Sequence, residues 1–373
     1  MSDNHSARKY VPGTHPDLPP PVRTTGPIAW VRMNLFSSPL NIVLTILSVW
    51  ILWSIIPAVV DWVFLDAVWD ATDRKDCWAQ MASPRDGACW AFIGGSFEFF
   101  LYGWYPDAER WRVNLTVVLL FLAIVGVLRE RLPGKKYWLW YAVAFPFIAA
   151  WLLIGGLGLA PVSTNKLGGI LLTVVIGVTG ISFALPIGII LALGRRSNLP
   201  ALRSVCVIFI EFIRGVPLIT LLFVASTMLT YFLPPGSTFD LLMRVLIMVT
   251  LFNSAYIAEV VRGGLQGLPS GQYEAADSLG LTYWKANRLI ILPQALKISI
   301  PGIVNTFIGL YKDTTLVLII GMMDIVGLGR ARLNDAEWLG LAPELYIFIA
   351  LFFFLCCFSM ARYSLNLEKR LGK

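Results

Sequence analysis

The chain has 373 residues, of which 57% are hydrophobic and 14% are charged, and its mean hydropathy is +0.70. An ordinary soluble domain carries about a quarter charged residues, so this composition excludes a protein whose whole surface faces water. The formal charge of +7 is compatible with nucleic-acid binding. However, the Lys and Arg residues fall between apolar runs, as the positive-inside rule describes for membrane proteins. We therefore expect a lipid bilayer around the chain and no nucleic-acid partner.

The first segment, residues 1–36, is polar and rich in proline, and it holds both histidines of the chain, His5 and His15. It lacks the short apolar core and small-residue cleavage site of a signal peptide. We interpret it as a disordered or polar cytoplasmic tail. Because all later residues lack histidine, we expect no haem, no histidine-bound metal ion and no histidine proton relay in the membrane.

Apolar runs of the length needed to cross a bilayer, about 20 residues, then recur along the chain. They predict about eight membrane-spanning helices and an all-α fold. A further apolar stretch at 90–104 is short and broken by Gly94 and Gly95, which favours an interfacial or re-entrant piece. The predicted spans cover residues 40–60, 113–129, 137–158, 168–194, 216–233, 240–261, 296–322 and 344–363.

Charges in the connecting loops predict the orientation. Basic residues follow the second, fourth, sixth and eighth spans, whereas the loop at 61–111 is rich in aspartate. The positive-inside rule then places both termini in the cytoplasm and the loop 61–111 outside. Cys77 and Cys89 lie in that outer loop, where a disulfide is one interpretation and a free pair is the other.

A change in organisation near residue 160 divides the spans into two groups. Three spans and the long outer loop occupy residues 37–160, which we interpret as an appended helical part. Five spans and one conspicuous inner loop, residues 262–295, occupy residues 161–373, which we interpret as the functional core.

The inner loop 262–295 should fold locally as two short helices. Glu274, Ala275 and Ala276 favour the first helix, and Gly280 is placed to end it in a left-handed conformation. Thr282 is a suitable N-cap for the second helix, and Pro293 stands where the chain turns back into the membrane. The apolar residues between them predict a partner surface; these are Leu279, Leu281, Tyr283 and Trp284.

The same loop resembles the EAA motif of ABC importer permeases, E-A-A-x3-G-x9-I-x-L-P. The positions that match the motif are Glu274, Ala275, Ala276, Gly280, Ile290, Leu292 and Pro293. The resemblance implies that the loop docks into a groove on an ATPase subunit, with Glu274 and Gly280 as key coupling positions and Leu281 beside them. We refer to residues 262–295 as the EAA loop.

Flanking segments extend the resemblance over residues 165–365. Residues 212–218 (FIRGVPL), 255–264 (AYIAEVVRGG), 292–295 (LPQA) and 312–316 (KDTTL) are similar to segments of the polar amino-acid permeases, with Thr315 in place of the usual serine. The long N-terminal part makes the chain most similar to the M-type membrane subunit of the general L-amino-acid and glutamate/glutamine/aspartate/asparagine importers.

That resemblance implies a type I (MetI-like) transmembrane core with about three extra N-terminal helices, in a bacterial inner membrane. It implies a second homologous permease subunit, an ATPase subunit dimer and an extracytoplasmic amino-acid-binding protein as partners. L-Amino acids would then move inward by alternating access. The chain itself would hold no cofactor, because ATP and Mg²⁺ would bind to the ATPase.

Charged residues within the spans are functional candidates, because a charge at membrane depth is costly. Glu259 is one helical turn from Arg262, so an i, i+3 ion pair is one role and substrate contact the other. Arg214, just before Pro217, is interpreted as a cytoplasmic anchor or gate element.

Lys312 and Asp313 form a second intramembrane candidate. They lie about 27 Å along the helix that begins at Gln294, if that helix is straight. Thr314 and Thr315 could bond to backbone groups freed by a helix break there. Asn305 lies seven residues before Lys312, on the same helix face. We predict that this face lines the substrate pathway; the alternative is a structural Lys–Asp arrangement at a helix break.

Other functions account for the sequence less well. A membrane enzyme would need a catalytic constellation, which the core does not offer. A self-contained ATP-driven pump would need a G-x4-G-K-[ST] phosphate loop, and the sequence has none. An ion-gradient-driven secondary amino-acid transporter is the alternative that remains, although it would need no ATPase dock and would often show inverted repeats.

Overall fold

The computed structural model describes residues 26–129, 132–232, 234 and 239–371, and all regular elements in this part of the chain are helical. The histidines of the predicted tail lie outside the described residues. By contact density the chain divides into two units, residues 1–68 with 81–88 and residues 69–80 with 89–373. Each unit is described here by itself.

The described part of the first unit holds the α-helices α1 (Pro27–Asn34) and α2 (Pro39–Val60), and α2 continues into the π-helix η2 (Asp61–Leu65). Helix α1 lies within residues 1–36, the segment interpreted as a disordered or polar tail, so part of that segment is helical. It forms because Pro27 occupies a first-turn position that needs no N–H donor. In α2, the Ser38 hydroxyl accepts the Asn41 N–H at 3.2 Å and so caps the helix.

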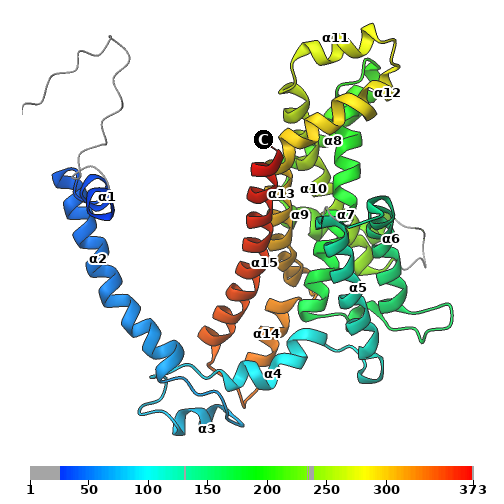
Figure 1. Cartoon of the computed structure of the whole chain (residues 1–373). Helices are drawn as coiled ribbons and strands as arrows, with labels where there is room; N and C mark the ends of the chain where they lie inside the picture. The colour runs from blue at the N-terminus through cyan, green and yellow to red at the C-terminus, as the bar shows by residue number, and fades with distance from the viewer. Residues whose placement is uncertain (1–25, 130–131, 233, 235–238, 372–373) are drawn as a thin grey trace, which may run out of the picture. The chain divides into compact units, whose positions relative to one another are not determined.

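The second unit holds the remaining helices, and Figure 1 labels its α-helices. They are α3 (Arg74–Ala79), α4 (Ala91–Tyr102), η3 (Asp107–Glu109), α5 (Arg110–Leu128), α6 (Lys135–Ile154), η4 (Thr164–Lys166), α7 (Gly169–Arg195), α8 (Pro200–Gly215), α9 (Leu218–Phe223), η5 (Val224–Met228), η6 (Leu229–Phe232), α10 (Leu241–Gln266), α11 (Ser270–Ser278), α12 (Tyr283–Ala286), η7 (Asn287–Ile291), α13 (Leu292–Asp313), η8 (Thr314–Ile320), α14 (Ile325–Leu333) and α15 (Ala342–Leu371).

Seven helical segments among the described residues are long and apolar enough to cross a membrane, and an eighth results if the bent pair of α8 with α9 and η5 counts as one span. Three of them, in α2, α5 and α6, precede α7. The stretch predicted at 90–104 forms α4, which has 12 residues and is shorter than a span.

The predicted span 216–233 is helical from Leu218 to Phe232, in α9, η5 and η6. Residues 200–215, which lay outside the predicted spans, form α8, and α8 meets α9 at an angle of 102°. The cause is local: Pro217 has no N–H donor and disfavours a helical conformation at the residue before it. Val216 is accordingly extended, with φ −110° and ψ 133°.

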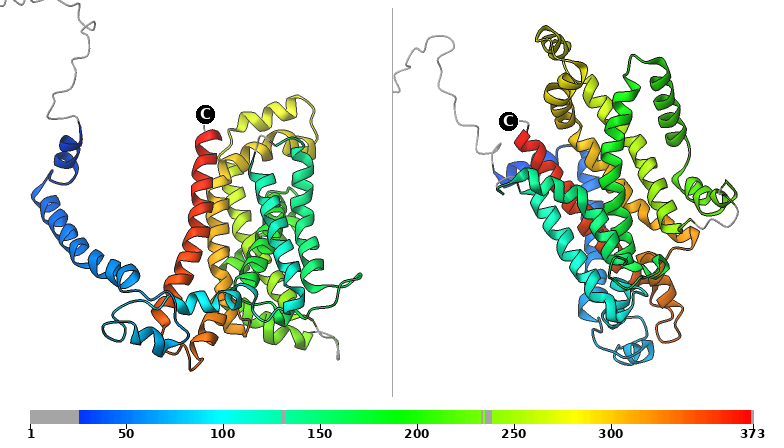
Figure 2. Two further views of the ribbon diagram at one scale, coloured as in Figure 1. Left: turned by 60° about the horizontal axis from the view of Figure 1, so that its bottom comes forward. Right: turned by 90° about the vertical axis from the view of Figure 1, so that its right-hand side faces the viewer.

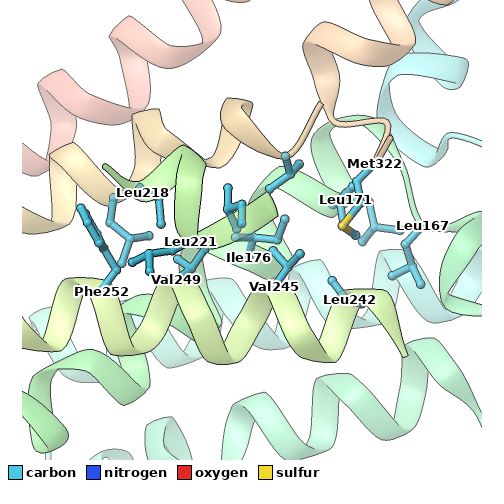
Figure 3. Close-up of a cluster of buried hydrophobic side chains, with 14 of the residues drawn as sticks. Leu167, Leu171, Ile176, Leu218, Leu221, Leu242, Val245, Val249, Phe252 and Met322 are labelled. Carbon is cyan, nitrogen blue, oxygen red and sulfur yellow. The ribbon is translucent and has the colours of Figure 1, made fainter. Parts of the chain in front are cut away.

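The core of the second unit lies where α7, α9 and α10 meet. Leu218 and Leu221 of α9 pack against Val245 and Val249 of α10 and Ile176 of α7 (Figure 3). Helices α7 and α10 approach closely at Gly188, where an added Cβ would lie 2.5 Å from the Ile257 side chain. Small residues at such crossings let membrane helices pack by van der Waals contact.

At the end of the unit away from the EAA loop, segments distant in sequence are tied together. Cys77 and Cys89 are joined in a disulfide in this structure. The Arg74 N–H donates to the Glu337 carbonyl at 2.8 Å, and the Cys89 N–H donates to the buried Glu344 carboxylate at 3.1 Å. These bonds fix Arg74 to the connection between α14 and α15, and Cys89 to the first turn of α15.

Asp324 caps α14 at the same end. Its carboxylate is fully buried and accepts the Gly327 N–H at 2.9 Å. Burial raises the pKa of this carboxyl to about 6, against the lowering effect of backbone donors. Its second oxygen is buried and, within the described residues, has no hydrogen-bond partner.

Candidate functional site

The EAA loop folds as the predicted pair of helices, α11 and α12, and both views of Figure 2 place this yellow segment at one end of the helical bundle. Gly280 has φ +66° and ends α11 as predicted. The Gly280 N–H donates to the Asp277 carbonyl at 2.9 Å, and the Leu281 N–H donates to the Ala276 carbonyl at 3.1 Å. These two bonds form a Schellman motif, which closes the helix C-terminus.

The second helix begins less tightly than expected. Thr282 is the N-cap residue of α12 and is extended, but its hydroxyl makes no capping hydrogen bond. Helix α12 then passes through the π-helix η7 directly into α13. Pro293 consequently lies in the first turn of α13 rather than at a separate turn into the membrane. The remaining motif positions Ile290 and Leu292 are half-buried on the same continuous path.

The surface of the EAA loop is apolar at its tip. Leu279 is 73% exposed and Trp284 is 72% exposed. Tyr283 is also exposed and packs edge-on against Trp284, whereas Leu281 is half-buried. Exposed apolar residues that neighbour one another are typical of protein interfaces. Of the EAA residues themselves, Glu274 and Ala275 are exposed and Ala276 is buried.

Tyr273 links the EAA loop to two spans. Its hydroxyl donates to the Leu265 carbonyl of α10 at 3.0 Å and accepts a bond from the Arg196 guanidinium, beyond α7, at 3.0 Å. Gln294 of α13 also bonds the Gln272 side chain at 2.9 Å. A displacement of α11 would therefore also displace the ends of α7, α10 and α13.

Glu259 is the centre of a cluster of charged residues. As predicted, it pairs with Arg262, at 2.8 Å on the same helix. Arg195 of α7 also lies 2.8 Å from its carboxylate, and Arg214 of α8 lies at 3.5 Å. Arg195 bonds Glu211 of α8 as well, at 2.8 Å. We call Arg195, Glu211, Arg214, Glu259 and Arg262 the Glu259 cluster.

The Glu259 carboxylate is well shielded, because its side chain is 14% exposed. Charge-assisted hydrogen bonds from several arginines offset the cost of removing it from water. The cluster joins α7, α8 and α10 at the end of the bundle from which the EAA loop projects. It can hold these three helices together, and it must rearrange if they separate.

The helix break that was considered near Lys312 is present. Helix α13 ends at Asp313 and continues as the 3₁₀-helix η8. The Thr314 and Thr315 hydroxyls donate to the Tyr311 and Lys312 carbonyls, at 2.7 Å and 3.0 Å. Asn305 and Lys312 are exposed in this chain, whereas Asp313 is half-buried and Thr314 is buried.

Sequence reasoning missed two arginine roles. Arg195 was used only as one of the basic residues that predict the orientation in the membrane. In the structure it pairs with Glu259 and Glu211. Arg244, in α10, donates to the Ala225 and Ser226 carbonyls at 3.1 Å and 2.7 Å. Those carbonyls belong to the π-helix η5, whose pattern frees backbone acceptors. The sequence did offer one signal for Arg244: it is a charged residue near the start of a predicted span, where a charge is costly.

These features define a multi-pass helical membrane protein with a projecting helix–turn–helix at one end. The family model described as "Binding-protein-dependent transport system inner membrane component" matches residues 184–373. The inner membrane amino-acid ABC transporter permease protein YhdY of Escherichia coli (strain K12) is 50% identical over 359 residues, covering 96% of each chain. The glutamate/glutamine/aspartate/asparagine transport system permease protein BztC of Rhodobacter capsulatus is 45% identical, covering 95% of this chain and 96% of the relative.

A solved structure, "Crystal structure of an amino acid ABC transporter with histidines", matches with 29% identity and a TM-score of 0.48, covering 54% of this chain and 92% of that chain. The chain belongs to the family of binding-protein-dependent transport system inner membrane components. It is a permease subunit of an ABC importer and not an enzyme. The expected all-α fold with a type I importer core is confirmed.

Proposed function

We propose that this permease subunit moves L-amino acids inward across a bacterial inner membrane, with both of its termini in the cytoplasm. It forms one pathway with a second, homologous permease subunit. An extracytoplasmic binding protein delivers the amino acid, and a separate ATPase dimer binds ATP and Mg²⁺. Closure of that dimer moves the EAA loop and switches the access of the pathway between the two sides of the membrane.

The EAA loop is the observation that carries this proposal. Its Schellman motif makes α11 a rigid unit, and the exposed Leu279 and Trp284 give that unit an apolar contact surface. The bonds of Tyr273 then connect the unit to α10 and to the end of α7. A small docking element with stiff links to several spans is suited to transmit the motion of a partner.

The substrate class is supported by the names of two relatives that match along nearly their whole length. One is an amino-acid permease, and the other is a permease for glutamate, glutamine, aspartate and asparagine. We infer that this chain carries the acidic amino acids and their amides, or a broader range of L-amino acids.

The Glu259 cluster and the Lys312 region are proposed to have different tasks. The cluster serves as a cytoplasmic latch, since it joins three helices by ion pairs. Exposed Lys312 and Asn305 line the pathway, where the ammonium group of Lys312 can meet a substrate carboxylate. Lys312→Met should lower the uptake of glutamate more than that of a neutral amino acid. Unchanged uptake and unchanged substrate range would remove Lys312 from the pathway.

Reconstitution tests the function as a whole. The chain should co-purify with an ATPase and a second permease, and proteoliposomes that contain all three should take up labelled amino acids when binding protein and ATP are present. Uptake by this chain alone, driven by an ion gradient, would instead establish the secondary transporter. A panel of labelled amino acids in the same assay then defines the substrate range.

A further inference from the structure

A groove of about 370 Å³ lies among α6, α7 and α10, apart from the EAA loop and the Glu259 cluster. Its walls include Ala149 and Ala150 of α6, Val178 of α7 and Leu246 of α10. The small alanine side chains leave space that larger residues would fill. This volume is typical of a site for a small ligand.

The lining is suited to hydrocarbon and not to an amino acid. Thr179 and Thr250 are the polar residues of the lining, and all the others are apolar. The ammonium and carboxylate groups of an amino acid would find no charged partner there, and their burial would be costly. The groove is therefore distinct from a substrate pathway.

The groove is long enough to span one bilayer leaflet. Its lining on α7 runs from Val174 to Ile187, a distance of about 20 Å at 1.5 Å per residue. Half of a hydrocarbon core about 30 Å thick is about 15 Å. Phe147 and Met243 of the lining are exposed, so the groove opens to the surroundings of the helices. An empty groove would lose dispersion contacts that an acyl chain supplies.

A basic residue directly precedes the lining of the groove in the sequence. Leu167 belongs to the lining, and Lys166 directly precedes it in η4. The same short helix is fixed to α10, because the Thr164 hydroxyl donates to the Asp240 carboxylate at 2.5 Å. Asp240 also accepts the Met243 N–H at 3.0 Å, so its carboxylate is engaged. The exposed Lys166 side chain has no hydrogen bond or ion pair within the described part of the chain.

We propose that this groove binds a membrane glycerophospholipid, with one acyl chain along α7 and the phosphate at Lys166. The apolar walls hold the chain, and the ammonium group attracts the phosphate as a point charge. The lipid then fills the space between α6 and the α7–α10 pair, and so connects the N-terminal spans of this unit to its core.

Native mass spectrometry of the full chain, purified in mild detergent with the subunits that accompany it, tests this proposal. Phosphatidylglycerol and phosphatidylethanolamine are the added probes. Ala149→Phe fills the groove, and Ala144→Phe is the matched control, since Ala144 is an exposed residue of the same helix outside the lining. The wild type and Ala144→Phe should retain one phospholipid, which Ala149→Phe should lose.

Lys166→Ala gives a second readout that does not depend on packing in the core. It should weaken retention about fivefold, the effect of one basic residue near a lipid headgroup. Equal retention by the wild type, Ala149→Phe and Lys166→Ala would overturn the proposal. So would a disulfide cross-link between Met243→Cys and a cysteine in a helix of another subunit, because that helix would then occupy the groove.

Discussion

The EAA loop and the Glu259 cluster lie toward the same end of the second unit but are held by different forces. Backbone hydrogen bonds between near neighbours close α11 at Gly280. The Glu259 cluster instead depends on side chains from α7, α8 and α10, which are far apart in sequence. The loop can therefore move as a rigid piece, whereas the cluster must break when its helices part. The first feature transmits motion, and the second resists it.

Glu259→Gln should produce the largest effect, because it leaves three arginines without their shared anion. Removing one partner of a shielded ion cluster should cost about 3 kcal/mol of stability. Uptake should fall at least tenfold if the cluster is a latch that defines one state of the transporter. Thermal unfolding in detergent and uptake in proteoliposomes measure the two effects.

Glu211→Gln is the matched control for this change. Glu211 bonds Arg195, but its side chain is 54% exposed, so the cost should stay within about 1 kcal/mol. Equal effects of the two substitutions would show that Glu259 has no special role.

Asp324 provides a contrast to Glu259, since it is a buried carboxylate that forms no ion pair among the described residues. Burial raises its pKa to about 6 in the folded protein. The folded state then binds the proton more tightly than the unfolded state does. The contribution of Asp324 to stability is therefore fully present below pH about 4 and is lost, by on the order of 2–3 kcal/mol, as pH rises through about 6.

Asp324→Asn should remove this fall, because asparagine does not ionise and keeps an oxygen for the Gly327 N–H. Thermal unfolding midpoints between pH 4 and 7 provide the measurement. If the wild type and the variant show parallel pH profiles, the carboxyl does not titrate in this range.

Gly280→Ala tests the rigidity of the EAA loop. An added Cβ would meet no atom within 4 Å, so the cost comes from the left-handed backbone at φ +66°. That conformation costs a residue with a Cβ about 1–2 kcal/mol. We expect fewer amino acids imported per ATP hydrolysed, with little loss of global stability.

Gly271→Ala, within α11, is the control, since an added Cβ there also meets no atom within 4 Å and the backbone is not left-handed. It should leave the ratio of uptake to hydrolysis unchanged. A similar loss in both variants would point to a general sensitivity of the loop and not to the turn at Gly280.

Tyr273→Phe should have the smallest effect. It removes the hydroxyl that joins α11 to Leu265 and Arg196, which should cost about 1 kcal/mol. ATP hydrolysis should persist while uptake per ATP declines modestly. An unchanged ratio would mean that motion reaches the spans through η7 and α13 instead.

The sequence was sufficient to predict features that depend on neighbouring residues. Gly280 ends α11 because glycine favours the left-handed conformation, and Thr314 and Thr315 bond carbonyls within one turn. The i, i+3 pair of Glu259 and Arg262 follows from helix geometry. The family followed from the spacing of the EAA motif.

Features that depend on long-range packing could not be predicted in this way. Arg195 is 64 residues from Glu259 in the sequence, and no local pattern pairs them. Helix α8 and its 102° bend to α9 were missed because residues 200–215 were left outside the predicted spans, although Pro217 carried the signal for a bend. The bonds of Arg244 depend on a π-helix, which periodicity does not reveal.

The central claim is that the EAA loop receives the motion of an ATPase, and Leu279→Asp tests it most directly. Leu279 is 73% exposed, so the substitution should leave the fold intact. Leu157→Asp, at a 93% exposed position at the other end of the unit, is the matched control. ATP-driven uptake by the reconstituted transporter should fall at least tenfold in the first variant and stay near the wild-type rate in the second. Wild-type uptake by Leu279→Asp would contradict the account.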